Sequence, residues 1–260
     1  MKNLINKNHH LDCLDLMAKM PDNFVDLVVT SPPYDDMRDY DGYNFDVWAT
    51  ICELYRITKR GGVVAWVVND SISDFDRSAT SFEQAIQFKE AGFKFYECII
   101  WNKGGSSFPS VEKYHQVYEF IFIFSKDTKP KTINLIKDQQ RKHPNNTRTT
   151  FLGRSKNGKM NARKTFLPQS DNLNRLRDNI WTIYPDKIIG QQHPAVFPER
   201  LASDLIYSFS QEGDLVYDPF AGSGTTLRVA KDLKRDYLGS EISPEYCKII
   251  EQRLAQEVIY

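Results

Sequence analysis

Nine consecutive residues near the carboxyl-terminal end, 218–226, combine an acid with two glycines and three hydroxyl side chains. They follow the apolar run 215–217 and precede Leu227-Arg228-Val229-Ala230, a pattern that predicts a strand, a glycine turn and a helix. Glycines at 222 and 224 let the backbone approach a ligand closely, and the first turn of a helix offers unpaired N–H groups. The stretch therefore predicts a ligand-binding turn. A tight turn that only joins two elements is the alternative.

The next predicted strand, 237–241, ends in an acid, Glu241. A carboxylate at this distance from a glycine turn can accept hydrogen bonds from ribose hydroxyl groups. The dinucleotide fingerprint needs a third glycine at position 227, which is leucine, and the phosphate-binding P-loop needs a lysine after Gly224, which is followed by threonine. The segment therefore favours a nucleoside cofactor over a phosphate-bound nucleotide.

A second motif lies near the other end of the chain, where the strand-like run 26–30 leads directly into Ser31-Pro32-Pro33-Tyr34. Two consecutive prolines fix two φ angles and remove two N–H donors, so the turn is stiff and presents free carbonyl oxygens. Such acceptors can bind an exocyclic NH₂ group, and the tyrosine ring can stack on a flat heterocycle. Alone, this turn is more often a plain loop. Together with 218–226 it predicts a site for an aromatic amine.

Composition sets the broad class of the protein. The chain has 260 residues, 41% of them hydrophobic, and no formal net charge, which predicts one globular domain with an insertion. No stretch has the length of a signal peptide core or a membrane span, so we expect a soluble, cytoplasmic protein. The four cysteines, at 13, 52, 98 and 247, lack metal-binding spacing, so we expect reduced thiols and no metal site.

The charges are unevenly distributed along the chain. Residues 126–187 carry 15 Lys and Arg against 5 Asp and Glu, interleaved with small polar residues. This pattern predicts a surface that contacts nucleic-acid phosphates, with an ordinary solvated loop as the alternative. The candidate phosphate-contacting residues are Arg141, Lys142, Arg148, Arg154, Lys156, Arg163 and Lys164.

Strand and helix patterns alternate through the rest of the chain. We expect a helix over 47–55 that ends at Gly61-Gly62, a strand over 63–68, and a helix capped by Ser81 with Gln84 that ends near Gly92. Strands are predicted at 93–101 and 117–124, and a helix after Pro198. Trp48 and Trp66 are expected in the core. This alternation predicts a mostly parallel sheet covered by helices on both faces.

The two motifs and their order resemble those of the β-class DNA amino-methyltransferases. In that family a Pro-Pro-Tyr motif comes first, a target-recognition region follows, and the Asp-Pro-Phe-x-Gly-Ser-Gly-Thr motif comes last. Protein glutamine and RNA guanine methyltransferases carry the two motifs in the reverse order. The resemblance implies a Rossmann-like, seven-stranded, mostly parallel sheet with one antiparallel strand at the edge. The catalytic domain would comprise 1–125 and 188–260, with 126–187 as the inserted region.

The resemblance also implies the cofactor, S-adenosyl-L-methionine, and the residues around it. Asp218, Phe220, Gly222, Gly224 and Thr225 would surround its methionine and ribose parts, and Glu241 would bind the ribose hydroxyls. Asp12, in Leu11-Asp12-Cys13-Leu14, matches an acid that faces the adenine, although Leu11 replaces the usual glycine. His193 matches a motif that caps a helix beside the cofactor.

The expected reaction is methylation of an exocyclic amine in double-stranded DNA. Ser31 and the Pro32 carbonyl would accept the amine N–H groups, Pro33 would stiffen the turn, and Tyr34 would stack on the flipped base. Serine at 31 after Thr30 favours cytosine N4, and adenine N6 is the alternative. A non-catalytic nucleic-acid-binding protein is the remote alternative. We expect a monomer or homodimer, with a cognate restriction endonuclease as a functional partner.

Overall fold

The computed structural model describes residues 3–33, 45–74, 76–105, 114–140, 148–154, 160–166, 174–185 and 198–256. Of 140, 148–154, 160–166 and 174 it describes the backbone alone. Tyr34, Arg141, Lys142, Lys156 and His193 therefore lie outside the described residues. The chain divides into two compact units, Met1–Asn134 with Asn179–Tyr260, and Leu135–Asp178.

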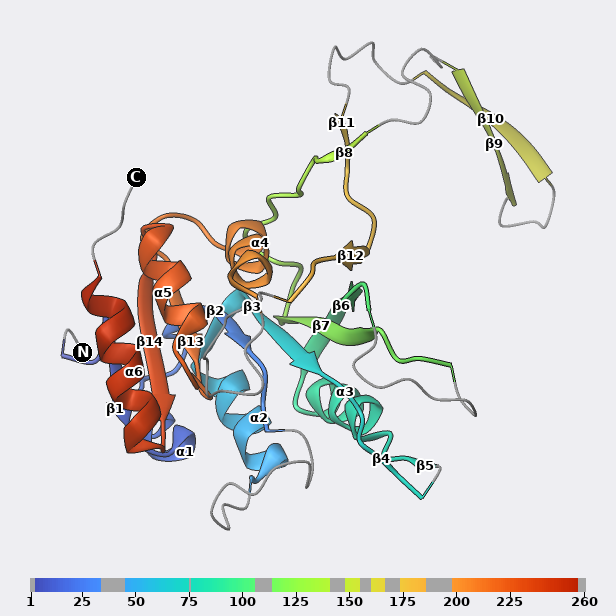
Figure 1. Cartoon of the computed structure of the whole chain (residues 1–260). Coiled ribbons are helices and arrows are strands. Elements are labelled where there is room, and N and C mark those ends of the chain that lie inside the picture. The colour runs from blue at the N-terminus through green and yellow to red at the C-terminus, as the bar shows by residue number, and fades with distance from the viewer. Residues whose placement is uncertain are drawn as a thin grey trace. The chain divides into compact units, whose positions relative to one another are not determined.

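The larger unit is built on an eight-stranded sheet (Figure 1). In spatial order its strands are β1 (Lys7–His10), β14 (Asp236–Glu241), β13 (Leu215–Asp218), β2 (Val25–Thr30), β3 (Thr58–Val68), β7 (Tyr118–Lys126), β6 (Phe93–Asn102) and β12 (Ile180–Thr182). Neighbouring strands are parallel except where β7 pairs with β3 and with β6. The predicted Rossmann-like α/β fold with a mostly parallel sheet is confirmed.

Two details of the predicted sheet are wrong. Over the described residues it has eight strands, not seven, and its antiparallel strand lies inside the sheet between β3 and β6, not at the edge. The crossover from β3 to β6 leaves one strand position open, and the chain folds back into it as β7. The short strand β12 then pairs with the outer side of β6.

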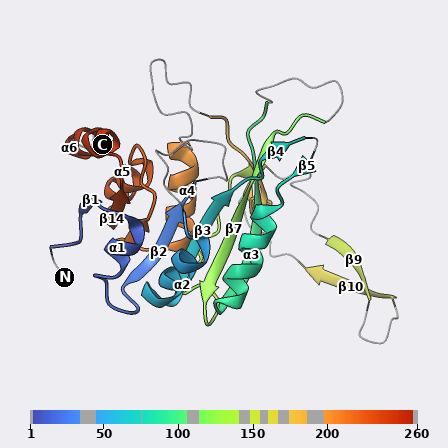
Figure 2. The same ribbon diagram turned by 90° about the horizontal axis from the view of Figure 1, so that it is seen from below.

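Helices cover both faces of the sheet, as the alternating pattern predicts. Figure 2 shows α1 (Cys13–Met17), α2 (Val47–Ile57) and α3 (Thr80–Glu90) on one face. The opposite face carries α4 (Glu199–Phe209), α5 (Thr225–Asp232) and α6 (Pro244–Ala255). Trp66, Phe88 and Phe124 are completely buried between the sheet and the first set, where the Phe88 and Phe124 rings stack with centroids 4.1 Å apart.

The predicted end of α2 at Gly61-Gly62 is wrong. The helix ends at Ile57, and β3 begins at Thr58 and runs through both glycines. A Cβ atom at Gly62 would lie 2.8 Å from the Lys59 carbonyl oxygen and 2.9 Å from that of Asp26. Glycine is therefore needed for close backbone packing inside the sheet, beside the register shift between Val25 and Leu27.

The predicted capping box at the start of α3 is also wrong, because both of its residues have partners elsewhere. The N-cap is Ala79 and makes no side-chain cap bond. The Ser81 N–H donates to Asp70 Oδ1 at 2.9 Å, and Gln84 Oε1 accepts from the Trp66 indole N–H at 2.8 Å. Tertiary contacts therefore replace the local cap, while the predicted end of the helix before Gly92 agrees with the structure.

Only one of the two tryptophans expected in the core is there. Trp66 is completely buried, whereas Trp48 is 46% exposed. Trp48 lies on α2 outside the buried face, which is formed by Thr50, Ile51, Leu54 and Ile57.

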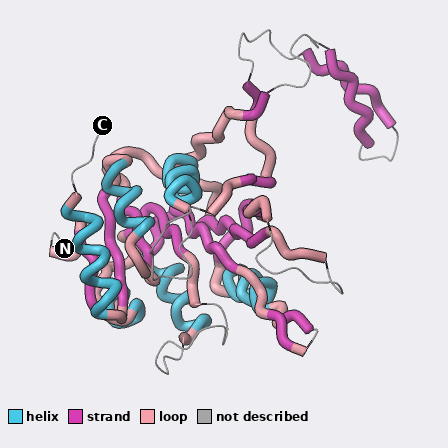
Figure 3. The backbone as a smooth tube through the Cα atoms, in the orientation of Figure 1, coloured by secondary structure: helices cyan, strands magenta, loops and turns pink. Residues whose placement is uncertain are grey.

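The smaller unit contains two pairs of antiparallel strands (Figure 3). They are β8 (Gln139–Gln140) with β11 (Asn174–Arg175), and β9 (Arg148–Arg154) with β10 (Met160–Phe166). This unit lies within the expected insertion 126–187 but is narrower than it. The Asn134 N–H donates to the Ser208 carbonyl at 2.8 Å, and β12 pairs with β6, so both flanks belong to the larger unit.

Two further elements complete the described chain, the short antiparallel strands β4 (Ile72–Ser73) and β5 (Asp76–Arg77). Within the described residues, none of the helices is both long enough and apolar enough to cross a membrane. The four cysteines are free thiols, with Cys13 and Cys247 buried.

Candidate active site

The two sequence motifs meet at the point where the sheet reverses its strand order. From β2 the chain continues through α2 to β3 on one side, and from β13 it continues through α5 to β14 on the other side. In open α/β sheets, ligands bind outside the carboxyl ends of the strands at such a switch point. Residues 31–33, here called the proline turn, directly follow β2, and residues 219–224, the glycine turn, directly follow β13.

Buried hydroxyl groups connect the ends of these two strands. Thr30 Oγ1 donates a hydrogen bond of 2.6 Å to Asp218 Oδ1, across a separation of 188 residues in the chain. Thr226 Oγ1, in the first turn of α5, donates to the Val29 carbonyl at 3.2 Å. Both threonines are completely buried. The proline turn and the glycine turn are therefore anchored to each other and not only to their own strands.

Asp218 is an internal organiser of the glycine turn. Its side chain is buried, and Oδ1 also accepts the Phe220 N–H at 3.0 Å. Burial raises the pKa of Asp218 to about 6, although hydrogen bonds from the Thr30 hydroxyl and the Phe220 N–H act in the opposite direction. The described contacts of this acid are thus within the protein, and its direct contact with a cofactor stays a prediction.

The glycines of the turn are required by backbone geometry. Gly222 and Gly224 have φ values of 52° and 82°, a left-handed conformation that favours glycine. Gly224 is also the N-cap of α5, and a Cβ atom there would lie 2.9 Å from Ile250 Cγ1. The sequence pattern predicts that these glycines let a ligand approach the backbone. In the structure, close packing against Ile250 is a second reason for glycine at 224.

Glu241 ends β14 beside the glycine turn. Its two carboxylate oxygens accept the Gly222 N–H and the Ser243 N–H, each at 2.8 Å. Burial raises the pKa of Glu241, and these backbone N–H groups oppose the rise. A carboxylate has about four acceptor positions, so the bonds from backbone N–H groups leave capacity for a hydroxyl donor. The orientation and remaining capacity of Glu241 fit a ribose.

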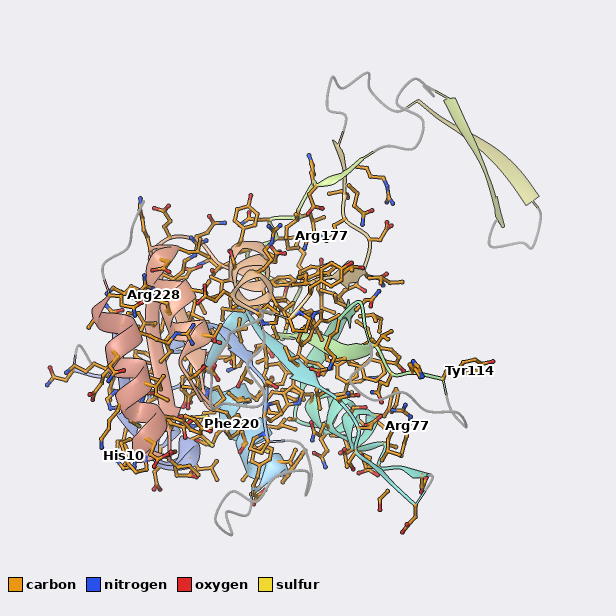
Figure 4. All side chains as sticks on the ribbon, viewed as in Figure 1. His10, Arg77, Tyr114, Arg177, Phe220 and Arg228 are labelled. Carbon is orange, nitrogen blue, oxygen red and sulfur yellow. The ribbon has the colours of Figure 1, made fainter. Side chains whose placement is uncertain are left out.

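Asp12 and Phe220 follow the carboxyl ends of β1 and β13, the same end of the sheet at which Glu241 lies. Asp12 is the N-cap of α1, and its Oδ1 accepts the Leu14 N–H at 2.7 Å. The half-buried Phe220 ring packs edge-on against Phe45, with centroids 4.9 Å apart. Figure 4 labels Phe220 and His10, the last residue of β1. Both lie toward the lower end of the sheet in this view, where β14 ends.

The proline turn itself is partly accessible. Pro32 is buried, whereas Ser31 and Pro33 are half-buried at the carboxyl end of β2. Tyr34, the predicted stacking residue, lies outside the described residues. The structure thus brings three of the four predicted catalytic residues to the switch point.

Arg253 supports the glycine turn and was missed by the sequence analysis. From α6 its Nη1 donates to the Ser223 carbonyl at 3.0 Å and to Thr225 Oγ1 at 3.3 Å, and its Nη2 donates to Glu199 at 2.7 Å. An arginine in the last turn of an amphipathic helix usually indicates a solvent-exposed position. Nothing in the local pattern shows that it reaches back to Thr225, a predicted cofactor residue.

The predicted phosphate-contacting residues lie in the smaller unit or outside the described chain. Arg148, Arg154, Arg163 and Lys164 belong to β9 and β10, where Lys164 pairs with Thr150 and Arg163 with Phe151. Two other arginines of this unit form internal ion pairs. Arg175 binds Asp178 with Nη1 and Nη2 at 2.5 and 2.8 Å, and Arg177 binds Asp138.

Comparison with known proteins relates this geometry to a family. Residues 25–252 match the family model described as DNA methylase. The orphan methyltransferase M.BamHII of Bacillus amyloliquefaciens is 47% identical over 244 residues, which cover 90% of each chain.

Two solved structures resemble this chain over almost its whole length. TTHA0409 of Thermus thermophilus, solved in complex with S-adenosyl-L-methionine, is 26% identical with a TM-score of 0.62, over 97% of this chain and 95% of that one. The cytosine-N4-specific PvuII DNA methyltransferase has a TM-score of 0.68 at 20% identity, over 97% and 87% of the two chains. At that identity, the second likeness concerns the fold alone.

Proposed function

The chain belongs to the DNA methylase family of restriction-modification amino-methyltransferases, and we propose that it methylates the N4 amino group of cytosine at a specific site in duplex DNA. Enzymes of this family use S-adenosyl-L-methionine. The observation that carries the proposal is the junction of the proline turn and the glycine turn through the Thr30–Asp218 bond of 2.6 Å. The proposed site for the amine and the proposed site for the nucleoside cofactor would thereby adjoin each other.

The glycine turn and its neighbours would hold the cofactor. Glu241 would accept the ribose hydroxyls while the Gly222 and Ser243 N–H groups fix its orientation. Gly222, Gly224 and Thr225 would shape the backbone beside the methionine part, with Asp218 ordering the turn from within and Asp12 on the adenine side. The cofactor, when bound, supplies an electrophilic methyl group on a sulfonium.

The proline turn would prepare the attacking amine. An amine conjugated to an aromatic ring is a weak nucleophile, because its lone pair is delocalised into the ring. Acceptance of its two N–H groups by the Ser31 hydroxyl and the Pro32 carbonyl localises that lone pair and directs it at the methyl group. Pro33 keeps the turn stiff. Tyr34 would stack on the target base once it has left the duplex.

The choice of cytosine rests on Ser31. A neutral hydroxyl, rather than a carboxylate, precedes Pro32-Pro33 and follows Thr30, a combination that we associate with cytosine N4. Adenine N6 methylation by the same arrangement is the alternative, because the family includes enzymes of both kinds.

The test is nucleoside mass spectrometry of DNA from an expression host without methylases of its own. We expect N4-methylcytosine with the wild-type chain and a loss of at least about a hundredfold with Tyr34→Ala. Tyr96→Ala is the matched control, since Tyr96 is an exposed residue of β6, and it should methylate normally. A peak of N6-methyladenine would overturn the choice of base. The absence of both modified bases would contradict a DNA methyltransferase activity.

We also propose that the basic region 126–187 contacts the DNA phosphates. Its excess of Lys and Arg suits a surface that follows the backbone of a duplex, and Arg163 and Lys164 adjoin each other on β10. A change of both to glutamine should weaken DNA binding and reduce the slope of log K against log salt by about 1 for each phosphate that the variant no longer neutralises. Lys94→Gln, at an exposed residue of the larger unit, is the control. An unchanged slope in the double variant would contradict the assignment.

No feature of the described chain identifies a restriction endonuclease that shares this target. The relative M.BamHII is named an orphan methyltransferase. A cognate endonuclease therefore stays a prediction from the family resemblance, as do the alternatives of monomer and homodimer.

A further inference from the structure

We propose that Thr30 is a positioning residue for methyl transfer, which holds the proline turn at a fixed distance from the glycine turn through its bond to Asp218. This inference rests on the proposed function and deepens it. Thr30 precedes the predicted catalytic residues and would touch neither the base nor the cofactor, because its side chain is completely buried.

The backbone ladder between β2 and β13 ends before it reaches the site. Its last pair is Val28 with Tyr217, so Thr30 and Asp218 lie beyond the paired residues. Pro219 has no N–H with which to extend the ladder. The hydrogen bond of 2.6 Å between Thr30 Oγ1 and Asp218 Oδ1 therefore connects the two strands where backbone pairing has stopped.

A second hydroxyl group, from the first turn of α5, also binds the carboxyl end of β2. Thr226 Oγ1 donates at 3.2 Å to the carbonyl of Val29, the residue that follows the last pair of the ladder to β13. Thr226 is also completely buried. Two side chains, one from the last residue of β2 and one from the first turn of α5, thus connect the carboxyl ends of β2 and β13.

The Asp218 carboxylate makes this connection sensitive to the loss of a donor. Its described hydrogen-bond donors are neutral, namely the Thr30 hydroxyl group and the Phe220 N–H. A buried acceptor that loses one of few donors moves to recover it or stays poorly satisfied. Either response would shift the glycine turn relative to the proline turn. A displacement of about 1 Å between reacting groups can cost about a hundredfold in rate.

The experiment compares Thr30→Val, Thr30→Ser and Thr50→Val in kcat, in KM for DNA and in the Kd of S-adenosyl-L-methionine by calorimetry. Thr30→Val should lower kcat by about tenfold or more and change the cofactor Kd by less than about threefold. Thr30→Ser keeps the hydroxyl and should recover most of kcat. Thr50 is an equally buried threonine of α2 whose described contact is Cys13 Sγ at 4.0 Å, so Thr50→Val should keep the wild-type kcat.

The outcomes separate this inference from the proposed function. A wild-type kcat in Thr30→Val would overturn the inference and leave the function intact. So would an equal loss in Thr50→Val, or a failure of serine to restore kcat, since either would indicate general packing. If Thr30→Val does not fold, Thr226→Val tests the same junction, and an unchanged kcat there would refute it. A wild-type chain that methylates no DNA would overturn the proposed function, and the inference with it.

Discussion

The two ends of the central sheet satisfy their acidic side chains in different ways. At the amino end, charges pair with charges. Lys59 Nζ lies 2.6 Å from Asp26 Oδ2, and Arg56 binds Asp22 and Glu53. At the carboxyl end, Asp218 and Glu241 accept hydrogen bonds from hydroxyl and backbone N–H groups. The ion pairs at the amino end hold neighbouring elements together, whereas Glu241, held only by neutral backbone donors, keeps acceptor capacity for a ligand.

Basic side chains at the amino end of the sheet also bind backbone carbonyl groups of neighbouring segments. Arg56 donates to the Met17 and Met20 carbonyls at 2.7 and 2.8 Å in addition to its acidic partners. Its bonds to Glu53 raise the pKa of Arg56. The Lys126 ammonium group donates to Asn23 Oδ1 and to the Arg56 carbonyl, and burial lowers the pKa of Lys126. A change at this end should therefore affect stability, and a change at the other end should affect ligand binding.

The sharpest test of that division is Gly224→Val at the carboxyl end. The added side chain would meet Ile250 and occupy a left-handed conformation with φ 82°. We expect the variant to lose binding of S-adenosyl-L-methionine by calorimetry. Gly213→Val is the matched control, because Gly213 has φ 81° with no atom within 4 Å of its Cβ position. It should keep cofactor affinity despite a similar backbone strain, and normal binding by Gly224→Val would contradict the prediction.

The next largest effect is expected at the amino end, for Arg56→Met. This change leaves two carbonyls and two carboxylates without their guanidinium partner, which should lower the free energy of unfolding by about 3 to 4 kcal/mol. Denaturant unfolding measures the loss, and the cofactor Kd of the folded variant should not change. Arg200→Met is the control, since the Arg200 side chain is 61% exposed and its ion pair with Asp204 runs along its own helix. A weakened cofactor affinity in Arg56→Met would show that the two ends are not separate.

The raised pKa of Asp218 predicts a dependence of stability on pH. Burial moves this pKa from 3.8 to about 6, so the folded protein binds the proton more tightly than the unfolded chain does. The contribution of Asp218 to the free energy of unfolding is therefore largest below about pH 4 and falls by about 3 kcal/mol as the pH rises to 6. Asp218→Asn should remove this fall, as measured by unfolding at pH 4 and pH 7. A wild-type slope in the variant would refute the assignment.

The smallest effect should come from Lys59→Met. The Lys59 side chain is 42% exposed although its partner Asp26 is mostly buried, and a pair in contact with solvent contributes at most about 1 kcal/mol. Asp26 would keep its second described bond, from the Leu215 N–H at 3.0 Å. Thermal unfolding should detect a small decrease in Tm. A decrease in stability as large as that of Arg56→Met would contradict the minor role that we assign to the Lys59–Asp26 pair.

The sequence predicted the fold class and the elements that carry the two motifs because their signals are local. Consecutive prolines, paired glycines and a strand ending in an acid each fix a short piece of backbone. The predicted strands 26–30, 215–217 and 237–241 agree with β2, β13 and β14 to within one residue at either end. Their order in the chain was enough to suggest that both motifs belong to one site.

The errors arose where a distant partner decides the local structure. Ser81 and Gln84 have the spacing of a capping box, but Asp70 and Trp66 bind them instead. The three-residue strand β12 has no periodicity of its own; it pairs with β6 beside the bond from the Trp101 indole N–H to the Ile183 carbonyl, at 2.8 Å. Arg253 was missed for the same reason, since its partners lie on other elements.

The pairing of the first strand with the last also sets the order of events when the protein is made. β1 pairs with β14, from the pair Lys7–Leu238 to the pair His10–Glu241. In the same way, β2 pairs with β13, which is synthesised much later. On a ribosome, β1 and β2 emerge long before these partners and must remain unpaired on that side until β13 and β14 have been synthesised. Contacts so distant in the chain slow folding. A nascent chain can therefore complete its switch point only after residue 241 has been added.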